Sequence, residues 1–349
     1  MCKDVICETF ISVVVLNYNG KSHLDDCLGS LKNINYANYD VFLVDNASTD
    51  DSLKYVRDNY PWVKLISLDK NYGFAEGYNI AISKIDSEFI AILNNDVGVD
   101  RNYLSEIHIE LSKPENKDIF AFGSLLLDFY KPNIIDNSGL LVTYCGTGFG
   151  LDNLKDRASV NNTPIAFAFT CGAAMVVRRS LFLEIGGFDP DYFAYAEDID
   201  ICWRAWLFGY RTMIVRRSIV YHKYGGSWGS LNSPNRLFLD QKNRLANIIK
   251  NCDSSIIIPC LTISLLYDLF RLGIFLYQNR PDNIKSVIYG TYIFLLSTPA
   301  LLEKRKTIMH NKKKNGKYLK DNDLIASLYC SVRRMMHEKY MKSNQAFIG

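Results

Sequence analysis

The 349-residue sequence lacks several motifs that would assign it to a common class of protein. Its nine cysteines include no C-x-x-C pair, which argues against a zinc site or a disulfide scaffold and for reduced thiols in a cytosolic compartment. No G-x-G-x-x-G follows the first apolar run and no G-x-x-x-x-G-K-[ST] occurs, which disfavours a dehydrogenase and a P-loop ATPase. The first ten residues lack the features of a secretory signal, so we expect the folded part to stay in the cytoplasm.

A charge-free apolar run of about 20 residues, as a spanning helix needs, is also lacking. Asp268 and Arg271 interrupt Ile256–Phe275, and Ile284–Leu302 is apolar only after Lys285. The net charge is +3, and the tail at 303–349 holds 12 Lys and Arg against 4 Asp and Glu. We therefore favour helices lying in the membrane interface over a hairpin through the bilayer or a core or dimer helix. The tail lacks interleaved aromatic residues, so no nucleic-acid partner is expected.

Short apolar runs alternate with amphipathic stretches over the first 127 residues. Strands are predicted at Phe10–Leu16, Tyr39–Val44, Val63–Ser67, Phe89–Leu93 and Ile119–Leu125. Leucines at helical spacing predict a helix between the first two strands, over Ser22–Lys32. Strand–helix alternation predicts an α/β fold with a mainly parallel central sheet, whose ligands bind outside the carboxyl ends of the strands.

The second half of the sequence is less regular. Residues 128–170 are predicted to form loops. Further predicted elements are strands at Cys171–Val177, Thr212–Val215 and Ser218–Tyr221, and helices at Arg179–Ile185, Ile199–Phe208 and Asn235–Lys250. We divide the chain into an α/β catalytic domain at 1–251 and a membrane-associating helical region with a basic tail at 252–349.

Short polar side chains follow the predicted strands, at the edge where ligands of a parallel sheet bind. The clusters are Asn17-Tyr18-Asn19-Gly20, Asp45-Asn46-Ala47-Ser48-Thr49-Asp50 and Asn94-Asn95-Asp96, with Asn71 to Asn79 opening a helix. Asp45 can accept hydrogen bonds from a pyrimidine or a ribose, and Asn79 and the Gly73 backbone can approach ribose and phosphates. Each residue alone is also typical of a turn or helix cap. Together they predict a nucleotide site.

An acidic stretch at 186–200 crowds carboxylates together, and Glu197 and Asp198 stand where a helix begins. Carboxylates this close repel one another, so at least one is expected to be a stronger base than a free Asp. Such a base suits proton removal from an acceptor hydroxyl. The alternative is a solvated acidic helix N-terminus.

Five motifs in this order resemble the inverting family 2 glycosyltransferases with the GT-A fold, in particular their rhamnosyltransferase-like subgroup. The motifs are Val13–Asn19, Val44–Asp50, Asn71–Ala75, Leu93–Asp96 and Gly186–Asp198. The resemblance covers roughly 60% of the chain. It implies that Asp198 is the catalytic base and that Glu197 positions the acceptor or a metal-bound water.

The resemblance also implies the remaining site residues. The nucleotide is contacted by Asn17, Asn19, Asp45, Asn46, Gly73, Asn79 and Asn95, and Mg²⁺ or Mn²⁺ by Asp96 and His222. Gly172, Trp203 and Arg204 contact donor or acceptor. The chain departs from the pattern at Asn94, where many relatives carry Asp. Alternatives for His222 and Trp203 are a structural histidine and a core tryptophan.

The predicted activity is metal-dependent transfer of a sugar from a dTDP- or UDP-sugar, with dTDP-rhamnose as first candidate. The acceptor would be a lipid-linked or cell-surface glycan at the cytoplasmic face of the membrane. Two alternatives are a non-catalytic, membrane-bound scaffold and a sugar nucleotidyltransferase. The latter would need a Gly-rich basic loop after the first strand, where Asn17-Tyr18-Asn19-Gly20 stands. The oligomeric state is left open.

Overall fold

A computed structural model describes residues 8–166, 168–223 and 233–315. Its strands are β1 (Ile11–Asn17), β2 (Tyr39–Asp45), β3 (Lys64–Ser67), β4 (Phe89–Asn94), β5 (Val97–Val99), β6 (Ile119–Asp128), β7 (Ile135–Asn137), β8 (Leu140–Val142), β9 (Gly148–Gly150), β10 (Ala174–Arg178) and β11 (Arg211–His222). Its α-helices are α1 (Leu24–Lys32), α2 (Ser52–Asn59), α3 (Gly73–Lys84), α4 (Tyr103–Leu111), α5 (Arg179–Glu184), α6 (Glu197–Leu207), α7 (Pro234–Asn251), α8 (Ile257–Tyr277) and α9 (Pro281–Asn315). The predicted basic tail beyond residue 315 lies outside the described residues.

The central sheet has the strand order β3-β2-β1-β4-β10-β6-β11-β5, and β7 pairs with β6. Strands β1 to β4 are parallel, as is the pair β6 and β11, while β10, β5 and β7 run antiparallel to their neighbours. Parallel pairing accounts for most of the paired residues because helices carry the chain between successive strands. The predicted α/β fold with a mainly parallel sheet is confirmed.

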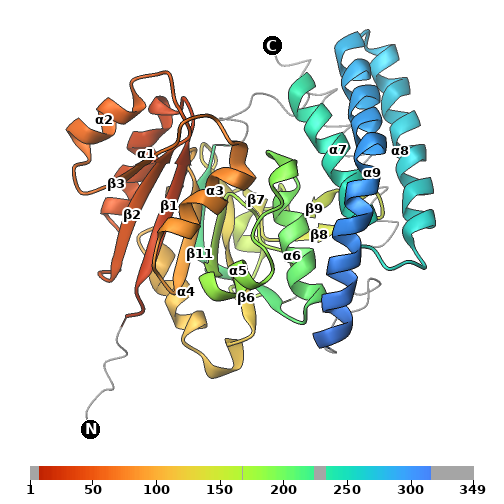
Figure 1. Cartoon of the computed structure of the whole chain (residues 1–349). Helices are drawn as coiled ribbons and strands as arrows, with labels where there is room; N and C mark the ends of the chain where they lie inside the picture. The colour runs from red at the N-terminus through yellow and green to blue at the C-terminus, as the bar shows by residue number, and fades with distance from the viewer. Residues whose placement is uncertain (1–7, 167, 224–232, 316–349) are drawn as a thin grey trace.

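Helices cover both faces of the sheet, which explains why its strands are nearly continuous apolar runs (Figure 1). Along β1, Val13 and Val15 pack in one buried cluster, together with Leu28 of α1 and Ile107 of α4. Val14 points the other way, into a second buried cluster that contains residues of α3 and α6. Successive side chains of a strand alternate between faces, so β1 contributes to both clusters.

Three regions are more ordered than the sequence predicts. The two short strands predicted at 212–215 and 218–221 are one strand, β11, with a register shift between Val215 and Ile219. The 128–170 region, predicted as loops, contains β7, β8 and β9. Strand β5, only three residues long, directly follows Asp96 and was not predicted.

Helices α7, α8 and α9 stand side by side at one end of the molecule, with α8 on the side away from the sheet (Figure 1). Phe294, Leu301 and Ile308 of α9 belong to the same buried cluster as the core residues of α6. By length and composition, α8 and the segment Pro281–Lys312 of α9 are long and apolar enough to cross a membrane.

The charged residues that interrupt the apolar sequence of α8 face the protein. Asp268 and Arg271 are buried, and Asp268 accepts hydrogen bonds from Arg244 and Gln241 of α7. The opposite face of α8 is apolar and exposed, with Leu265, Leu266 and Leu269 about 60% exposed. The charges therefore leave the outer face of the helix uninterrupted.

Candidate active site

A cavity of about 340 Å³ lies where β1, β2 and β4 end. Of the predicted site residues, those lining it are Asn46, Gly73, Asn95, Asp96, Gly172, Glu197, Asp198 and His222. Those that do not line it are Asn17, Asn19, Asp45, Asn79, Trp203 and Arg204. The structure thus brings together residues from distant parts of the sequence. We call the predicted residues that do not line the cavity the supporting set.

Asn17 and Asp45 belong to the supporting set because their polar atoms are used within the protein. Asn17 is fully buried, donates to Ser48 Oγ at 3.2 Å and accepts from Asn95 Nδ2 at 2.8 Å. Asp45 is 2% exposed and accepts from the Ser48 N–H at 3.1 Å. Asn19 Oδ1 accepts from the Thr49 N–H at 2.7 Å. These bonds join the loops after β1, β2 and β4, and Asn17, Asn19 and Asp45, which were predicted to contact the nucleotide, do not line the cavity.

The start of α3 is fixed against the acidic stretch. Gly73 has φ +74°, and a Cβ there would lie 2.4 Å from the Phe193 carbonyl oxygen, so only glycine fits. That carbonyl accepts from the Phe74 N–H at 2.6 Å. Asn46 holds the same turn by donating to the Gly73 carbonyl at 2.9 Å. The loop after β2, the start of α3 and the acidic stretch are therefore joined to one another by hydrogen bonds.

Asn79, which was predicted to contact ribose or phosphate, does not line the cavity. Its amide donates to the Phe188 carbonyl at 2.8 Å and its oxygen accepts from the Phe188 N–H at 3.0 Å. A side chain that satisfies both backbone groups of one residue acts as a clamp. Asn79 holds the beginning of the acidic stretch against α3.

Asp198 stands in the first turn of α6 and its carboxylate is held on two sides. One oxygen accepts from the Gly172 N–H at 2.9 Å and the other from the Ile199 N–H at 2.8 Å. Burial raises the pKa of Asp198 above its ordinary value, although these hydrogen bonds act against the shift. Burial, more than repulsion by neighbouring carboxylates, makes it a stronger base than a free Asp.

Glu197, beside it, is buried, and its Oε2 has no hydrogen-bond partner among the described residues. Burial, followed by the charge of Asp198, raises the pKa of Glu197 well above its usual range. The two adjacent carboxyl groups therefore favour a state that carries fewer than two negative charges. A cation or a hydroxyl in the cavity would relieve this unfavourable arrangement.

His222 ends β11 between two carboxylates. Its Nδ1 lies 2.8 Å from Asp136 Oδ2, and its Nε2 lies 3.8 Å from Asp96 Oδ1. An ionised carboxylate can only accept, so Nδ1 carries the proton and Nε2 faces Asp96. Burial opposes the charged imidazole, but the hydrogen bond and charge of Asp136 outweigh it, and the pKa of His222 is raised.

The Asp96 and His222 pair fits a divalent cation. One ion at metal–ligand distances of about 2.1 Å can contact two atoms that are 3.8 Å apart. A metal-ligating histidine usually donates a hydrogen bond from its second ring nitrogen to a carboxylate, which fixes the orientation of the ring. Asp136 accepts such a bond from His222 Nδ1. No group of three or more His, Cys, Asp or Glu residues suited to a metal occurs in the described ranges. Two protein ligands leave room for phosphate oxygens and waters.

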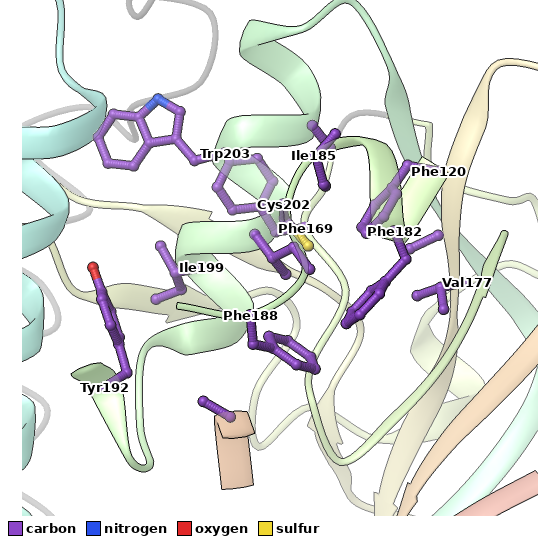
Figure 2. Close-up of a cluster of buried hydrophobic side chains, with 14 of the residues drawn as sticks. Phe120, Phe169, Val177, Phe182, Ile185, Phe188, Tyr192, Ile199, Cys202 and Trp203 are labelled. Atoms are coloured by element: carbon purple, nitrogen blue, oxygen red, sulfur yellow. The ribbon is translucent and has the colours of Figure 1, made fainter. Parts of the chain in front are cut away.

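Trp203 and Arg204, which were predicted to contact donor or acceptor, do not line the cavity. Trp203 is fully buried in the core cluster with Cys202 and Ile199 (Figure 2). Arg204 donates to Asp200 at 2.8 Å and to the carbonyl oxygens of Ile185 and Gly187. Trp203 therefore has the alternative core role, and Arg204 braces the turn that begins the acidic stretch.

A second group of carboxylates in the acidic stretch forms a buried network of ion pairs. Lys250 of α7 is 1% exposed and lies 2.6 Å from Asp189 and 2.8 Å from Asp200. Lys304 of α9 lies 2.5 Å from Asp189 and 2.7 Å from Asp191. Burial alone would raise the pKa of Asp200, but the charges of Arg204 and Lys250 outweigh it and hold that pKa well below its usual range. The C-terminal helices are thereby joined to the stretch that carries Asp198.

Three charged residues of the cavity lining were missed by the prediction from sequence: Asp136, Arg236 and Asp240. Asp136 lies in the irregular 128–170 region, where no apolar pattern indicated a strand. Arg236 and Asp240 are four residues apart on α7, a spacing that places both on one face of a helix. Only that spacing could have pointed to them.

The fold is similar to that of known sugar transferases. A solved mannosyltransferase, PcManGT from Pyrobaculum calidifontis in complex with GDP-Man and Mn²⁺, superposes with a TM-score of 0.52 at 17% identity, covering 89% of this chain and 88% of that one. This likeness shows a shared fold. The chain has the GT-A fold of nucleotide-sugar transferases.

The sequence comparisons give the family. The profile described as Glycosyl transferase family 2 matches residues 12–186, half of the chain, and the chain belongs to that family. It is 24% identical over 242 residues to an N-acetylglucosaminyl-diphospho-decaprenol L-rhamnosyltransferase of Mycobacterium tuberculosis, covering 63% of this chain and 78% of the relative. It is 26% identical over 219 residues to the rhamnosyltransferase WbbL of Escherichia coli, covering 58% and 78%. The predicted family is confirmed, and the protein is a glycosyltransferase that uses a nucleotide-sugar donor.

Proposed function

We propose that this glycosyltransferase moves a sugar from a dTDP- or UDP-sugar to a hydroxyl of a lipid-linked or cell-surface glycan, with inversion and with Asp198 as the general base. The observation that carries the proposal is the place of Asp198. Its carboxylate lines the cavity, is held by the Gly172 N–H, and has a raised pKa. A base with these properties suits removal of a proton from a sugar hydroxyl.

The proposed step is a single displacement. The acceptor hydroxyl gives its proton to Asp198, and its oxygen forms a bond to the anomeric carbon of the donor sugar. The bond from that carbon to the diphosphate breaks, and the nucleoside diphosphate leaves with the electron pair. Gly172 keeps the Asp198 carboxylate in place, and a Cβ at Gly172 would lie 3.1 Å from the Phe74 ring, so a side chain there would crowd the cavity.

Asp96 and His222 would hold Mg²⁺ or Mn²⁺, with Asp136 orienting the imidazole. When bound, the ion would neutralise charge on the departing diphosphate. The Mn²⁺ in the mannosyltransferase complex supports this proposal. Asn46, Gly73 and Asn95, which line the same cavity, would contact the nucleotide.

The exposed faces of α8 and α9 support an acceptor at the membrane surface. On α9, Tyr292, Leu295 and Leu296 are more than half exposed, next to the exposed leucines of α8. Apolar side chains gathered on one face indicate a binding surface, and tyrosines are frequent where membrane meets water. The printed name of the mycobacterial relative includes a diphospho-decaprenol, which is a lipid carrier. We therefore place the enzyme at the cytoplasmic face of the membrane, with dTDP-rhamnose as first donor to test.

The test is a donor panel with the full-length chain, Mn²⁺ and a polyprenyl-diphosphate-linked sugar in vesicles. Release of nucleoside diphosphate that needs both donor and acceptor is the expected result. The linkage in the product, read by NMR, should have the anomeric configuration opposite to that of the donor. Nucleotide binding without turnover of any donor would instead indicate a non-catalytic scaffold.

A further inference from the structure

The charges around the cavity are unbalanced. Its described lining holds five carboxylates, at Asp96, Asp136, Glu197, Asp198 and Asp240, and a single arginine or lysine, Arg236. Both substrates in the proposed function are anionic, since a nucleotide sugar carries a diphosphate and a lipid-linked glycan carries one as well. One divalent cation cannot balance these carboxylates and an incoming diphosphate. Arg236 is the fixed cation best placed to contribute.

The Arg236 guanidinium is held in place but keeps its hydrogen-bond donors. Its central carbon lies 4.7 Å from the centre of the Tyr195 ring, a stacking contact that orients the planar group. The structure gives it no hydrogen bond and no ion pair with any described residue. By contrast, Arg204 and Arg244, which lie in the interior, each donate to carboxylate or carbonyl oxygens. A guanidinium has five N–H donors that match phosphate oxygens in pairs.

Arg236 also lies on the side of the cavity nearest to the apolar helices. Arg236 and Asp240 face the cavity from α7. Between them in sequence, Leu237 packs with Phe275 of α8, and Phe238 stacks on Tyr289 of α9 with ring centres 5.3 Å apart. One helix, α7, therefore separates the cavity from the surface proposed to meet the membrane. The phosphates of a lipid carrier lie at such a surface.

We propose that Arg236 binds a diphosphate at this edge of the cavity, with its guanidinium pairing two phosphate oxygens. The proposal rests on the proposed function, because that function supplies both diphosphates. The ligand chemistry is shared by the nucleoside diphosphate of the donor and the diphosphate of a lipid-linked acceptor. The test below separates the two sources.

The experiment compares the full-length wild type with Arg236→Ala, Arg236→Lys and the control Arg101→Ala, whose side chain is exposed and away from the cavity. In the first arm, calorimetry with Mn²⁺ present gives the Kd of UDP and of dTDP. In the second, sedimentation with vesicles that contain polyprenyl diphosphate is compared with sedimentation with vesicles that contain polyprenol. Thermal unfolding of each variant verifies that it is folded.

Arg236→Ala should weaken one of these interactions tenfold or more, and Arg101→Ala neither. Arg236→Lys should recover only part of the loss, because an ammonium keeps the charge without the paired donors. A raised Kd for UDP or dTDP assigns the donor diphosphate, and loss of the preference for polyprenyl diphosphate assigns the acceptor. Changes below twofold in both arms would overturn the proposal. Because both arms measure binding, the outcome is separate from whether the wild type shows transfer.

Discussion

The acidic stretch at 186–200 supplies carboxylates to two regions with opposite properties. Glu197 and Asp198 line the cavity, and burial raises the pKa of both. Asp189 and Asp200 lie in the buried ion network, where Lys250 and other cations outweigh burial and lower the pKa of both. The nearest cations, and not burial itself, decide which carboxylates are structural and which remain available for chemistry.

Helix geometry explains how neighbours can differ so much. Asp198 and Asp200 are two residues apart in α6, and successive residues of an α-helix are rotated by about 100° around its axis. Their side chains therefore point to roughly opposite sides of the helix. Asp198 therefore faces the cavity and Gly172, while Asp200 faces Lys250 of α7. The first prediction below tests the cavity side, and the next tests the network side.

The largest expected effect is that of Asp198→Asn on catalysis. The amide cannot accept the proton, so the transfer rate should fall by roughly 100- to 10,000-fold. The Kd for UDP with Mn²⁺ should stay within about twofold, because Asp96 and His222 are untouched. Steady-state release of nucleoside diphosphate and calorimetry measure the two quantities. An unchanged transfer rate would remove Asp198 from the role of base.

On the network side, Lys250→Met should cost stability. Removing one partner of a buried ion pair leaves uncompensated charge, here on Asp189 and Asp200, and we expect a loss of about 3 kcal/mol in the free energy of unfolding. Denaturant titration followed by circular dichroism gives the value. Lys54→Met, which removes an exposed ion pair with Asp58, serves as the control and should change little. Equal stability of the Lys250 variant and the wild type would contradict the network account.

Asp136→Asn tests whether a cavity carboxylate supports His222 as a metal ligand. Loss of the charged partner of His222 Nδ1 should weaken Mn²⁺ affinity about 10- to 100-fold. Excess Mn²⁺ should then restore most of the transfer rate, and chelation with EDTA should abolish transfer in the wild type. Titration of activity with Mn²⁺ makes the measurement. If the Mn²⁺ requirement is unchanged, Asp136 does not support a metal ligand.

The smallest effect is expected for Lys304→Met. Lys304 is partly exposed, and Asp189 keeps its other partner, Lys250, so the loss should be about 1 kcal/mol or less. The KM for a lipid-linked acceptor should change more than the Kd for UDP, because Lys304 joins α9 to the acidic stretch. The exposed-site variant Lys306→Met removes the same charge from α9 and serves as the control. If the contact of Lys304 with the acidic stretch matters, the KM for the acceptor should change in Lys304→Met and not in Lys306→Met.

The sequence predicted the β1, β2, β3, β4 and β6 strands because each is a short apolar run bounded by polar turn residues. It also predicted the polar clusters at their ends, because the edge of a parallel sheet is fixed by topology. It could not assign side chains within those clusters. Asn17 and Asn95 belong to one hydrogen-bonded network, yet only Asn95 lines the cavity.

Other parts of the site depend on contacts between residues far apart in the chain. Asn79 clamps Phe188, 109 positions away, and Lys304 pairs with Asp189, 115 positions away. Neither pairing leaves a local periodic signal. The inward direction of Asp268 and Arg271 likewise depends on α7, which packs beside α8 and supplies Arg244 as a partner for Asp268.

The pH dependence of transfer and of folding, measured on one wild-type preparation, tests the central contrast most directly. A raised pKa at Asp198 means that the proposed base is protonated at a higher pH than a free Asp, and transfer should be lost with that protonation. The lowered pKa at Asp200 means that its stabilising contribution is present above the unfolded pKa and is lost only as pH falls further. Transfer should therefore fall, on acidification, while circular dichroism still reports a folded protein. Loss of transfer and of folding at the same pH would contradict the account.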